Sequence, residues 1–542
     1  MQDYTLSTDR LAYRVKGLRM AASVLHCGAH PDDEDIGLLS YLSHKYCVRV
    51  FYWSATRGEG GQNRVGPYTG EALGIYRTWE TLAARSNDGG EALFGPFFDF
   101  GYCKRSIDAF SKWGRETMVR EMVRAIRQAK PMIVVGRWLG ALSDLHGHHQ
   151  AVGEALYDAF DADAKPDRFP ELTSLGLPPW QPAKFYLSTD NTGGDYSAGA
   201  ALNLFGRLNP ELERNGALRI NTGEYDPISG MTYQKMAWLA YNNHKTQAHG
   251  MAPASGDFYY YFTLHKSHVP VPKRECEFFD GFDPTLAGLA ERLPGSGAAL
   301  KDQLRMVVRA VDEGLGALGA ADPRAAGFSL MQGLTLLREA IRSERGSDTE
   351  SMYRQAVLLS LDERCRDFED VAAQCLGLEL EGLSNKSRIT PDSRISVQVR
   401  LWNHRGAAID ELNFDLDVPT GWHVEKSRAA AASTELMLDC QVTAKPTDAF
   451  TCPYWLRSAR NGFVYTWPDD ATAGRPFSEP ELRANCRVTV DGTALTLRRP
   501  VVVRQAFPGG YREFPVAVVP PIALQPQLIQ EFRPVSQKKT DN

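Results

Sequence analysis

The sequence predicts an α/β fold with a Rossmann-like parallel sheet, followed by a helical connector and a C-terminal β-sandwich. Three successive patterns of hydrophobicity support this prediction. In the first ~270 residues, short strands rich in β-branched and aromatic residues alternate with amphipathic helices, which is typical of a parallel sheet covered on both faces. Apolar residues then recur at helical spacing, and from about residue 380 they recur at every second position.

The first domain is expected to span residues 1–270. We predict buried strands at 23–29 ("SVLHCGA"), 48–55 ("VRVFYWSA") and 131–138 ("PMIVVGRW"). Helices are predicted over 34–46, 69–86 and 116–130. Ligands of open parallel sheets bind at the carboxyl ends of the strands, so the residues that follow each strand are the candidates for a site.

A linker at 270–288 separates this domain from the rest. Residues 285–376 are expected to form a helical connector, because leucines and valines recur at helical spacing between Leu300 and Ile341 and a third helix is predicted over 350–376. Residues 380–525 are expected to form a β-sandwich accessory domain, with a hairpin at Asp491–Gly492. Residues 530–542 are expected to be a disordered tail.

Composition excludes several classes of function. The 542 residues carry 61 basic and 66 acidic side chains, without a dense Lys/Arg cluster, so we expect no nucleic-acid partner. No apolar run approaches the ~18 residues of a membrane span. The first 20 residues lack the apolar core of a signal peptide, which predicts a cytoplasmic protein as the sequence stands, or an extracytoplasmic one if a signal peptide was removed. The sequence makes no prediction of the oligomeric state.

Two polar clusters follow predicted strands. "CGAHPDDEDIG" (27–37) places a histidine and four acids where a strand gives way to a helix. Acids and proline also favour the first turn of a helix, so helix initiation is an alternative explanation. "GALSDLHGHHQAVGEAL" (140–156) follows another strand and holds three histidines in four positions.

In a parallel sheet these two strand ends can lie close together. His30, Asp33 and a histidine of the second cluster then form a three-ligand set of the kind that catalytic zinc takes, with a fourth position for water. Asp32 remains free to act as a base. We expect one Zn²⁺ per chain, although a site of this composition also accepts iron or another divalent ion.

"AHPDDE", followed about 115 residues later by "HxxH", resembles the PIG-L / LmbE-like family of zinc-dependent N-deacetylases. "TRGEGGQN" (56–63) and "HKTQAHGM" (244–251) resemble further segments of multidomain members. The resemblance implies that His30, Asp33 and His149 bind the metal. It implies that Asp32 is the general base and His146 the acid and oxyanion partner.

The resemblance also implies that Arg77 holds substrate, with an ordinary exposed helix pair as the alternative. Asn63 lies in a Gly-rich loop at a strand end and either lines the pocket, or the loop simply needs its glycines in order to turn. The chain departs from the family pattern at His148, where many members have Asp, and at Asp144, where shorter members often have Tyr. His148 could compete as a ligand, and Asp144 could pair with His146 and keep it protonated.

The expected function is a metal-dependent amidohydrolase that removes an N-acetyl or other N-acyl group from an amino sugar, such as N-acetylglucosamine, or a related amine, by attack of a metal-bound water. The expected partner is a small-molecule or glycan N-acylated substrate. One alternative is an amidase for a larger acyl conjugate. Another is a glycan-binding or scaffolding protein with a vestigial site.

Overall fold

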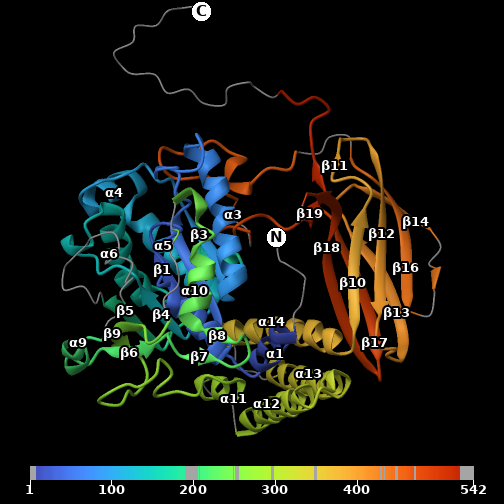
Figure 1. Ribbon diagram of the computed structural model, residues 1–542, viewed down its shortest axis with the longest axis horizontal. Coiled ribbons are helices and arrows are strands. Elements are labelled where there is room, and N and C mark those ends of the chain that lie inside the picture. Colours follow the sequence, from blue (N-terminus) through green and yellow to red (C-terminus); the bar gives the residue numbers. More distant parts are fainter. Residues whose placement is uncertain are drawn as a thin grey trace, which may run out of the picture.

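The computed structural model describes residues 8–189, 206, 208–247, 250, 255–293, 298–346, 351–427, 430–431, 434–445, 450–468, 472–508 and 510–524. It has an α/β part, a layer of long helices and a C-terminal β part (Figure 1). Within the described residues, no helix combines the length and the apolar character needed to cross a bilayer. The expected tail at 530–542 lies outside the described residues.

The N-terminal part is built on a seven-stranded sheet in the order β3-β2-β1-β4-β5-β9-β6. The first five strands in chain order are parallel, and β9 runs antiparallel to both β5 and β6. The strands are β1 (Ser23–Gly28), β2 (Arg49–Thr56), β3 (Glu91–Phe97), β4 (Ile133–Gly136), β5 (Lys184–Thr189), β6 (Leu218–Asn221) and β9 (Tyr259–Ser267). The strand order reverses at β1, which pairs with β2 on one side and β4 on the other, so the carboxyl ends of β1 and β4 are where a ligand is expected.

Helices cover both faces of this sheet. The main ones are α1 (Thr8–Gly17), α3 (Gly70–Asp88), α4 (Ser106–Trp113), α5 (Arg115–Ala129), α6 (Gly147–Ala162) and α10 (Tyr233–Tyr241). The short helix α2 (Ile36–Tyr41) continues as a π-helical turn, Leu42–Tyr46. The expected helix at 34–46 therefore begins two residues later than predicted, and its first turn contains no acid. Asp35 is the N-cap residue of α2 and makes no side-chain cap bond, so helix initiation accounts for Asp35 at most and not for the other three acids.

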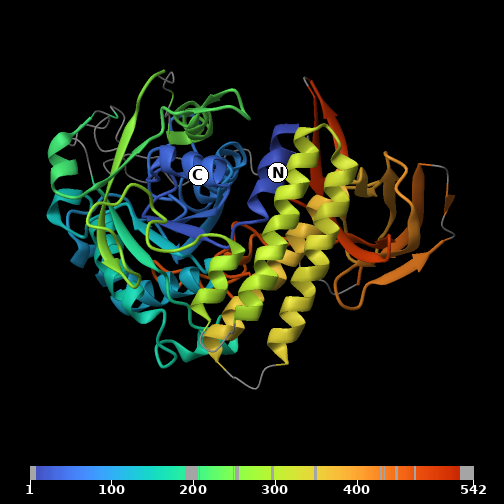
Figure 2. The same ribbon diagram turned by 90° about the horizontal axis from the view of Figure 1, so that it is seen from below.

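Three long helices join the two sheets. These are α12 (Ala298–Gly319), α13 (Pro323–Arg345) and α14 (Met352–Cys375), and Figure 2 shows them lying between the two β parts. Asp370 of α14 pairs with Arg14 of α1 at 2.5 Å and with Arg499 of the C-terminal sheet at 2.6 Å. Because one α14 carboxylate contacts both parts, this helix connects them directly.

The C-terminal part is a curled nine-stranded sheet whose main path runs β13-β17-β18-β10-β12-β16-β14. Its strands are β10 (Leu378–Ser384), β12 (Arg394–Asn403), β13 (Ile409–Asp417), β14 (His423–Lys426), β15 (Ala430–Ala431), β16 (Glu435–Thr443), β17 (Arg483–Val490), β18 (Thr493–Phe507) and β19 (Gly510–Pro515). Alternate residues of β12 are buried, as the period-two pattern predicts. Asp491 and Gly492 both have positive φ, 47° and 71°, and form the predicted two-residue hairpin turn.

One segment of the C-terminal part leaves its sheet. Between β16 and β17 the chain crosses to the N-terminal part, and we call its residues 454–468 and 472–477 the arm (orange, beside α3 in Figure 1). The arm bonds to the edge strand β3 and the residues just after it: Phe94 N donates to Gly474 O at 2.8 Å, Phe98 N to Phe463 O at 2.9 Å, and Tyr465 N donates to Pro96 O at 2.7 Å. These bonds satisfy backbone groups at the edge of the sheet that would otherwise be unpaired.

Candidate active site

The two polar clusters meet at the predicted strand ends. His30 and Asp33 follow β1, and His146 to His149 follow β4, the strand that pairs with β1. His146 is the N-cap of α6, since its Nδ1 accepts a hydrogen bond of 3.0 Å from His148 N. This cap sets where α6 begins, and His149, in the first turn of α6, lies beside His30 of the segment after β1.

The side chains of His30, Asp33 and His149 form a group that could hold a metal ion. His149 Nε2 lies 3.3 Å from His30 Nδ1 and 3.6 Å from Asp33 Oδ1. His30 Nδ1 lies 3.5 Å from Asp33 Oδ2. Tetrahedral zinc with ligands at 2.0–2.1 Å separates neighbouring ligand atoms by about 3.4 Å. The two histidine nitrogens are close to this separation, and each lies at a similar distance from one of the two Asp33 oxygens.

Other residues orient each member of this triad. His149 donates from Nδ1 to Asp144 O at 3.1 Å, and its ring stacks on Trp138 with centroids 3.7 Å apart. His30 Nε2 lies 3.1 Å from His148 Nδ1, so a proton on Nε2 leaves the Nδ1 lone pair free. Such contacts fix the tautomer of a ligating histidine.

Asp33 is held in the same way. Its Oδ2 accepts hydrogen bonds from Ala29 N at 2.8 Å, His30 N at 2.9 Å and Trp138 Nε1 at 2.9 Å. Both His149 and His30 lower the pKa of the Asp33 carboxyl, overcoming the effect of burial, which raises it. The side chain is therefore a carboxylate at neutral pH. Two nitrogen lone pairs and this carboxylate converge on one point, which fits a divalent cation.

The electrostatics of the triad agree with this fit. Burial lowers the pKa of His30, but the negative charges of Asp33 and of more distant carboxylates raise it by more than burial lowers it. The net result is a pKa of about 9. Burial lowers the pKa of His149 to about 4. The carboxylate thus favours one positive charge among the imidazoles, and a proton on His30 competes with a metal ion for the same site.

A second group, His30, His146 and His148, also lies within metal-binding distance. It lacks a carboxylate, and the His148 side chain is fully buried, with its ring centroid 4.2 Å from that of Trp113 and 4.4 Å from that of Phe100. His148 Nδ1 already faces His30 Nε2. These contacts favour His148 as the partner that orients His30 over a role as a ligand.

The four acids of the motif have different environments. Asp32 is half-buried, whereas Asp33, Glu34 and Asp35 are buried. Glu34 pairs with Arg85 and His244, each at 2.9 Å, and Asp35 lies 3.5 Å from His26 and 3.7 Å from Arg137. Asp32 is thus the one carboxylate of the motif that combines access to solvent with a position beside the triad.

Gln247 contacts Asp32. With its amide nitrogen turned toward the carboxylate, Gln247 donates to Asp32 Oδ1 at 2.8 Å. The preceding residue, Thr246, is held by Glu80, which accepts from its backbone N–H and from its hydroxyl, each at 2.7 Å. Helix α3 therefore positions the segment that carries Gln247.

Arg77 and Asn63 are both engaged in hydrogen bonds with neighbouring groups of the chain. Arg77 is neither exposed nor free: it is 3% exposed and donates to Gly58 O at 2.7 Å, Gln62 O at 2.8 Å and Thr246 Oγ1 at 3.3 Å. Asn63 Nδ2 donates to Tyr68 O at 3.0 Å, and its Oδ1 accepts from two N–H groups of the same turn. Arg77, from α3, and Asn63, within the loop, therefore both hold the loop over 58–68 by hydrogen bonds to its backbone.

The surroundings of His146 favour the neutral ring. Burial and the neighbouring His30 and His149 lower the pKa of His146 to about 3. Asp144 does not counter this, because its carboxylate accepts from the backbone N–H groups of Leu139, Gly140 and Ala141. Since His146 Nδ1 accepts from His148 N, the neutral ring carries its proton on Nε2.

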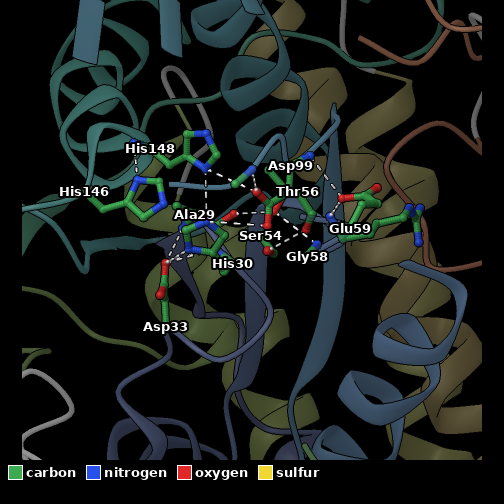
Figure 3. A network of polar contacts seen from close by, with 12 residues as sticks. Ala29, His30, Asp33, Ser54, Thr56, Gly58, Glu59, Asp99, His146 and His148 are labelled. Carbon is green, nitrogen blue, oxygen red and sulfur yellow. Dashed lines mark hydrogen bonds and ion pairs between the residues drawn. The ribbon is translucent and has the colours of Figure 1, made fainter. Parts of the chain in front are cut away.

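Two further carboxylates, those of Asp99 and Glu59, lie near His30 (Figure 3). Asp99 Oδ2 is 4.0 Å from His30 Nε2 and its Oδ1 is 3.8 Å from His148 Nδ1, as expected of a residue that supports the ligands. Glu59 Oε2 accepts from the backbone N–H groups of Arg57 and Asp99, each at 3.2 Å. Burial, and then the charge of Asp99, raise the pKa of Glu59 to about 7.

The sequence analysis assigned no role to Gln247, His244, Glu59 or the arm. Only the resemblance of "HKTQAHGM" to longer family members pointed toward Gln247 and His244. Glu59 lies in "TRGEGGQN", which resembles a family segment, but no local signal gives its role. None identifies the arm either, because the partners of both lie far away in the sequence.

Comparison with known proteins adds a family match. Residues 25–160 match the PIG-L family model, described as GlcNAc-PI de-N-acetylase. No curated protein matches the chain. Among solved structures, an N,N′-diacetylchitobiose deacetylase from Pyrococcus horikoshii, complexed with its inhibitor MPG, aligns at 20% sequence identity with a TM-score of 0.26. That alignment covers 30% of this chain and 59% of the deacetylase chain.

Proposed function

We propose that this chain is a metal-dependent N-deacetylase, on the premise that residues 25–160 form a PIG-L family domain. It removes an N-acetyl or other N-acyl group from an acylated amino sugar or a related amine. N-acetylglucosamine is the first substrate that we propose. The observation that carries the proposal is the convergence of His30 Nδ1, Asp33 and His149 Nε2 at 3.3–3.6 Å beside the half-buried carboxylate of Asp32.

The three residues would hold one Zn²⁺, and iron or another divalent ion also suits this donor set. A cation held there would polarise the amide carbonyl and lower the pKa of a water to about 7. The outer contacts of the triad keep the ligating lone pairs aimed at one point before any ion binds.

Asp32 is the proposed general base. Its carboxylate accepts a proton from the water that attacks the acyl carbon, and the hydrogen bond from Gln247 at 2.8 Å keeps the carboxylate in place. Glu34 is a poor alternative because it is buried between Arg85 and His244.

His146 is the proposed oxyanion partner. As a neutral ring with the proton on Nε2, it donates to the oxygen on which negative charge develops. The proton that Asp32 takes from the water passes to the leaving nitrogen when the C–N bond breaks, which restores the Asp32 carboxylate and leaves His146 neutral. The products are a carboxylate and a free amine.

For Arg77 and Asn63 we propose a positioning role for the 58–68 loop in place of direct contact with substrate, because their polar groups are already engaged. The acyl group and the leaving amine stay open, so an amidase for a larger acyl conjugate uses the same residues. A glycan-binding protein with a vestigial site is the other alternative.

We further propose that the chain is organised as a deacetylase domain at 1–270, a helical connector at 285–376 and a β-sandwich at 380–525. Lys426 of β14 pairs with Asp415 of β13 at 2.8 Å, so the two ends of the curled sheet approach each other. This approach supports a sandwich, in which two layers of strands enclose a core.

The test measures free amine released from N-acetylglucosamine and N,N′-diacetylchitobiose, with metal content determined on the same samples. Asp32→Asn should retain the metal and lose roughly 10²–10⁴-fold in turnover, as expected for a lost general base. His30→Ala should lose both metal and activity. Near-normal turnover in Asp32→Asn would assign the base to another residue. A wild-type protein that binds metal and releases no amine from any N-acylated sugar or amine would favour the binding-protein alternative.

A further inference from the structure

We propose that the arm, although it belongs to the C-terminal sheet, is a positioning element of the metal site: it fixes His148 and Asp99, and through them the orientation of His30. The inference rests on the proposed function, because it concerns the same metal site. It gives a role at the site to a segment of residues 380–525, which the sequence predicts to be an accessory domain.

An aromatic path runs from the arm to the triad. The Phe463 ring lies 5.3 Å from that of Phe100, centroid to centroid, and the Phe100 ring meets the edge of His148 at 4.4 Å. His148 Nδ1 then faces His30 Nε2 at 3.1 Å. Among the described residues, His148 Nε2 has no hydrogen-bond partner. Packing by Phe100 and Trp113 therefore determines how this ring lies, and Phe463 supports Phe100 from behind.

A polar path runs in parallel. Tyr465 of the arm donates from its hydroxyl to Glu59 Oε1 at 2.9 Å. The other oxygen, Glu59 Oε2, accepts from Asp99 N at 3.2 Å. The Asp99 carboxylate faces both His30 and His148 (Figure 3). Glu59 is 1% exposed, so this chain of contacts is shielded from bulk solvent.

The arm is itself held firmly against the site. Arg57, which directly follows β2, is fully buried with its guanidinium carbon 3.4 Å from the ring centroid of Trp455. It donates to Pro476 O at 3.1 Å and to Arg475 O at 3.2 Å. With the backbone bonds to β3, these contacts hold Phe463 and Tyr465 in register with the residues behind the triad.

The experiment measures Zn²⁺ affinity by competition with a chromophoric chelator, and the visible absorption spectrum of the Co²⁺-loaded full-length protein. Phe463→Ala should weaken Zn²⁺ binding by roughly 10–100-fold, the range for loss of a residue that orients a ligand, and should alter the Co²⁺ spectrum. Tyr465→Phe removes one hydroxyl and should give a smaller change in the same direction.

Arg475→Ala is the matched control, because the Arg475 side chain is half exposed and pairs with Glu479, two residues beyond the arm. It should leave both affinity and spectrum unchanged. If Phe463→Ala fails to fold, Phe463→Leu retains bulk and loses the aromatic edge, and the same change is expected.

Zn²⁺ affinity and Co²⁺ spectra equal to wild type in the folded Phe463 and Tyr465 variants would overturn the inference and leave the proposed function intact. A wild-type protein with no affinity for Zn²⁺ or Co²⁺ would overturn the proposed function and, with it, this inference.

Discussion

Trp455→Ala should be among the most destabilising single substitutions in this chain. The Trp455 side chain is fully buried, and its ring packs against the guanidinium of Arg57, which is also fully buried. Removing a buried tryptophan costs about 3–5 kcal/mol. Loss of a desolvated cation–π contact adds about 2 kcal/mol. Because the two effects overlap at one contact, we expect a total of about 4–6 kcal/mol.

This is a large fraction of the net stability of a domain, about 5–15 kcal/mol. It should appear as a lower urea midpoint in far-UV circular dichroism, together with earlier loss of the tertiary signal. Trp79→Ala is the control, since Trp79 also contacts the arm, at Phe477, but is 45% exposed. If Trp455→Ala shifted the midpoint no more than Trp79→Ala, the arm would not be part of the fold of the N-terminal domain.

The remaining predictions concern the site. His149→Ala should abolish tight Zn²⁺ binding, whereas His148→Ala should weaken it by roughly 10–100-fold, with both affinities measured by chelator competition. Equal losses of affinity in the two variants would indicate that His148 is also a ligand. Gln247→Ala should retain the metal and lower turnover by roughly 10-fold, as for one hydrogen bond to a charged group, and unchanged turnover would separate Gln247 from Asp32. Glu59 has its pKa raised from 4.5 to about 7, so the folded state keeps a proton that the unfolded chain releases. The free energy of unfolding should therefore fall, by on the order of 3 kcal/mol, as pH rises from 4.5 to 7. Glu59→Gln should remove this slope in urea unfolding at a series of pH values, and a slope that persists in the variant would have another origin.

The sequence by itself determined the features that depend on local patterns. Alternation of strands and helices predicted the parallel sheet, and the strand ends located both polar clusters, because the two sit directly after β1 and β4. His30, Asp33 and His149 come together as the motif resemblance implied. The Asp491–Gly492 turn follows from local backbone preference alone.

Only the tertiary structure decided what each polar side chain does. "HPDDED" contains four acids that look alike in sequence, yet Glu34 and Asp35 are neutralised by Arg85, His244 and Arg137, and Asp32 keeps access to solvent. The arm shows the same limit on a larger scale, since nothing near residues 454–477 indicates that they pack behind residues 57–99. Local patterns determine backbone conformation over a few residues. The charge state and role of a buried group depend on which distant segments desolvate it and supply its partners.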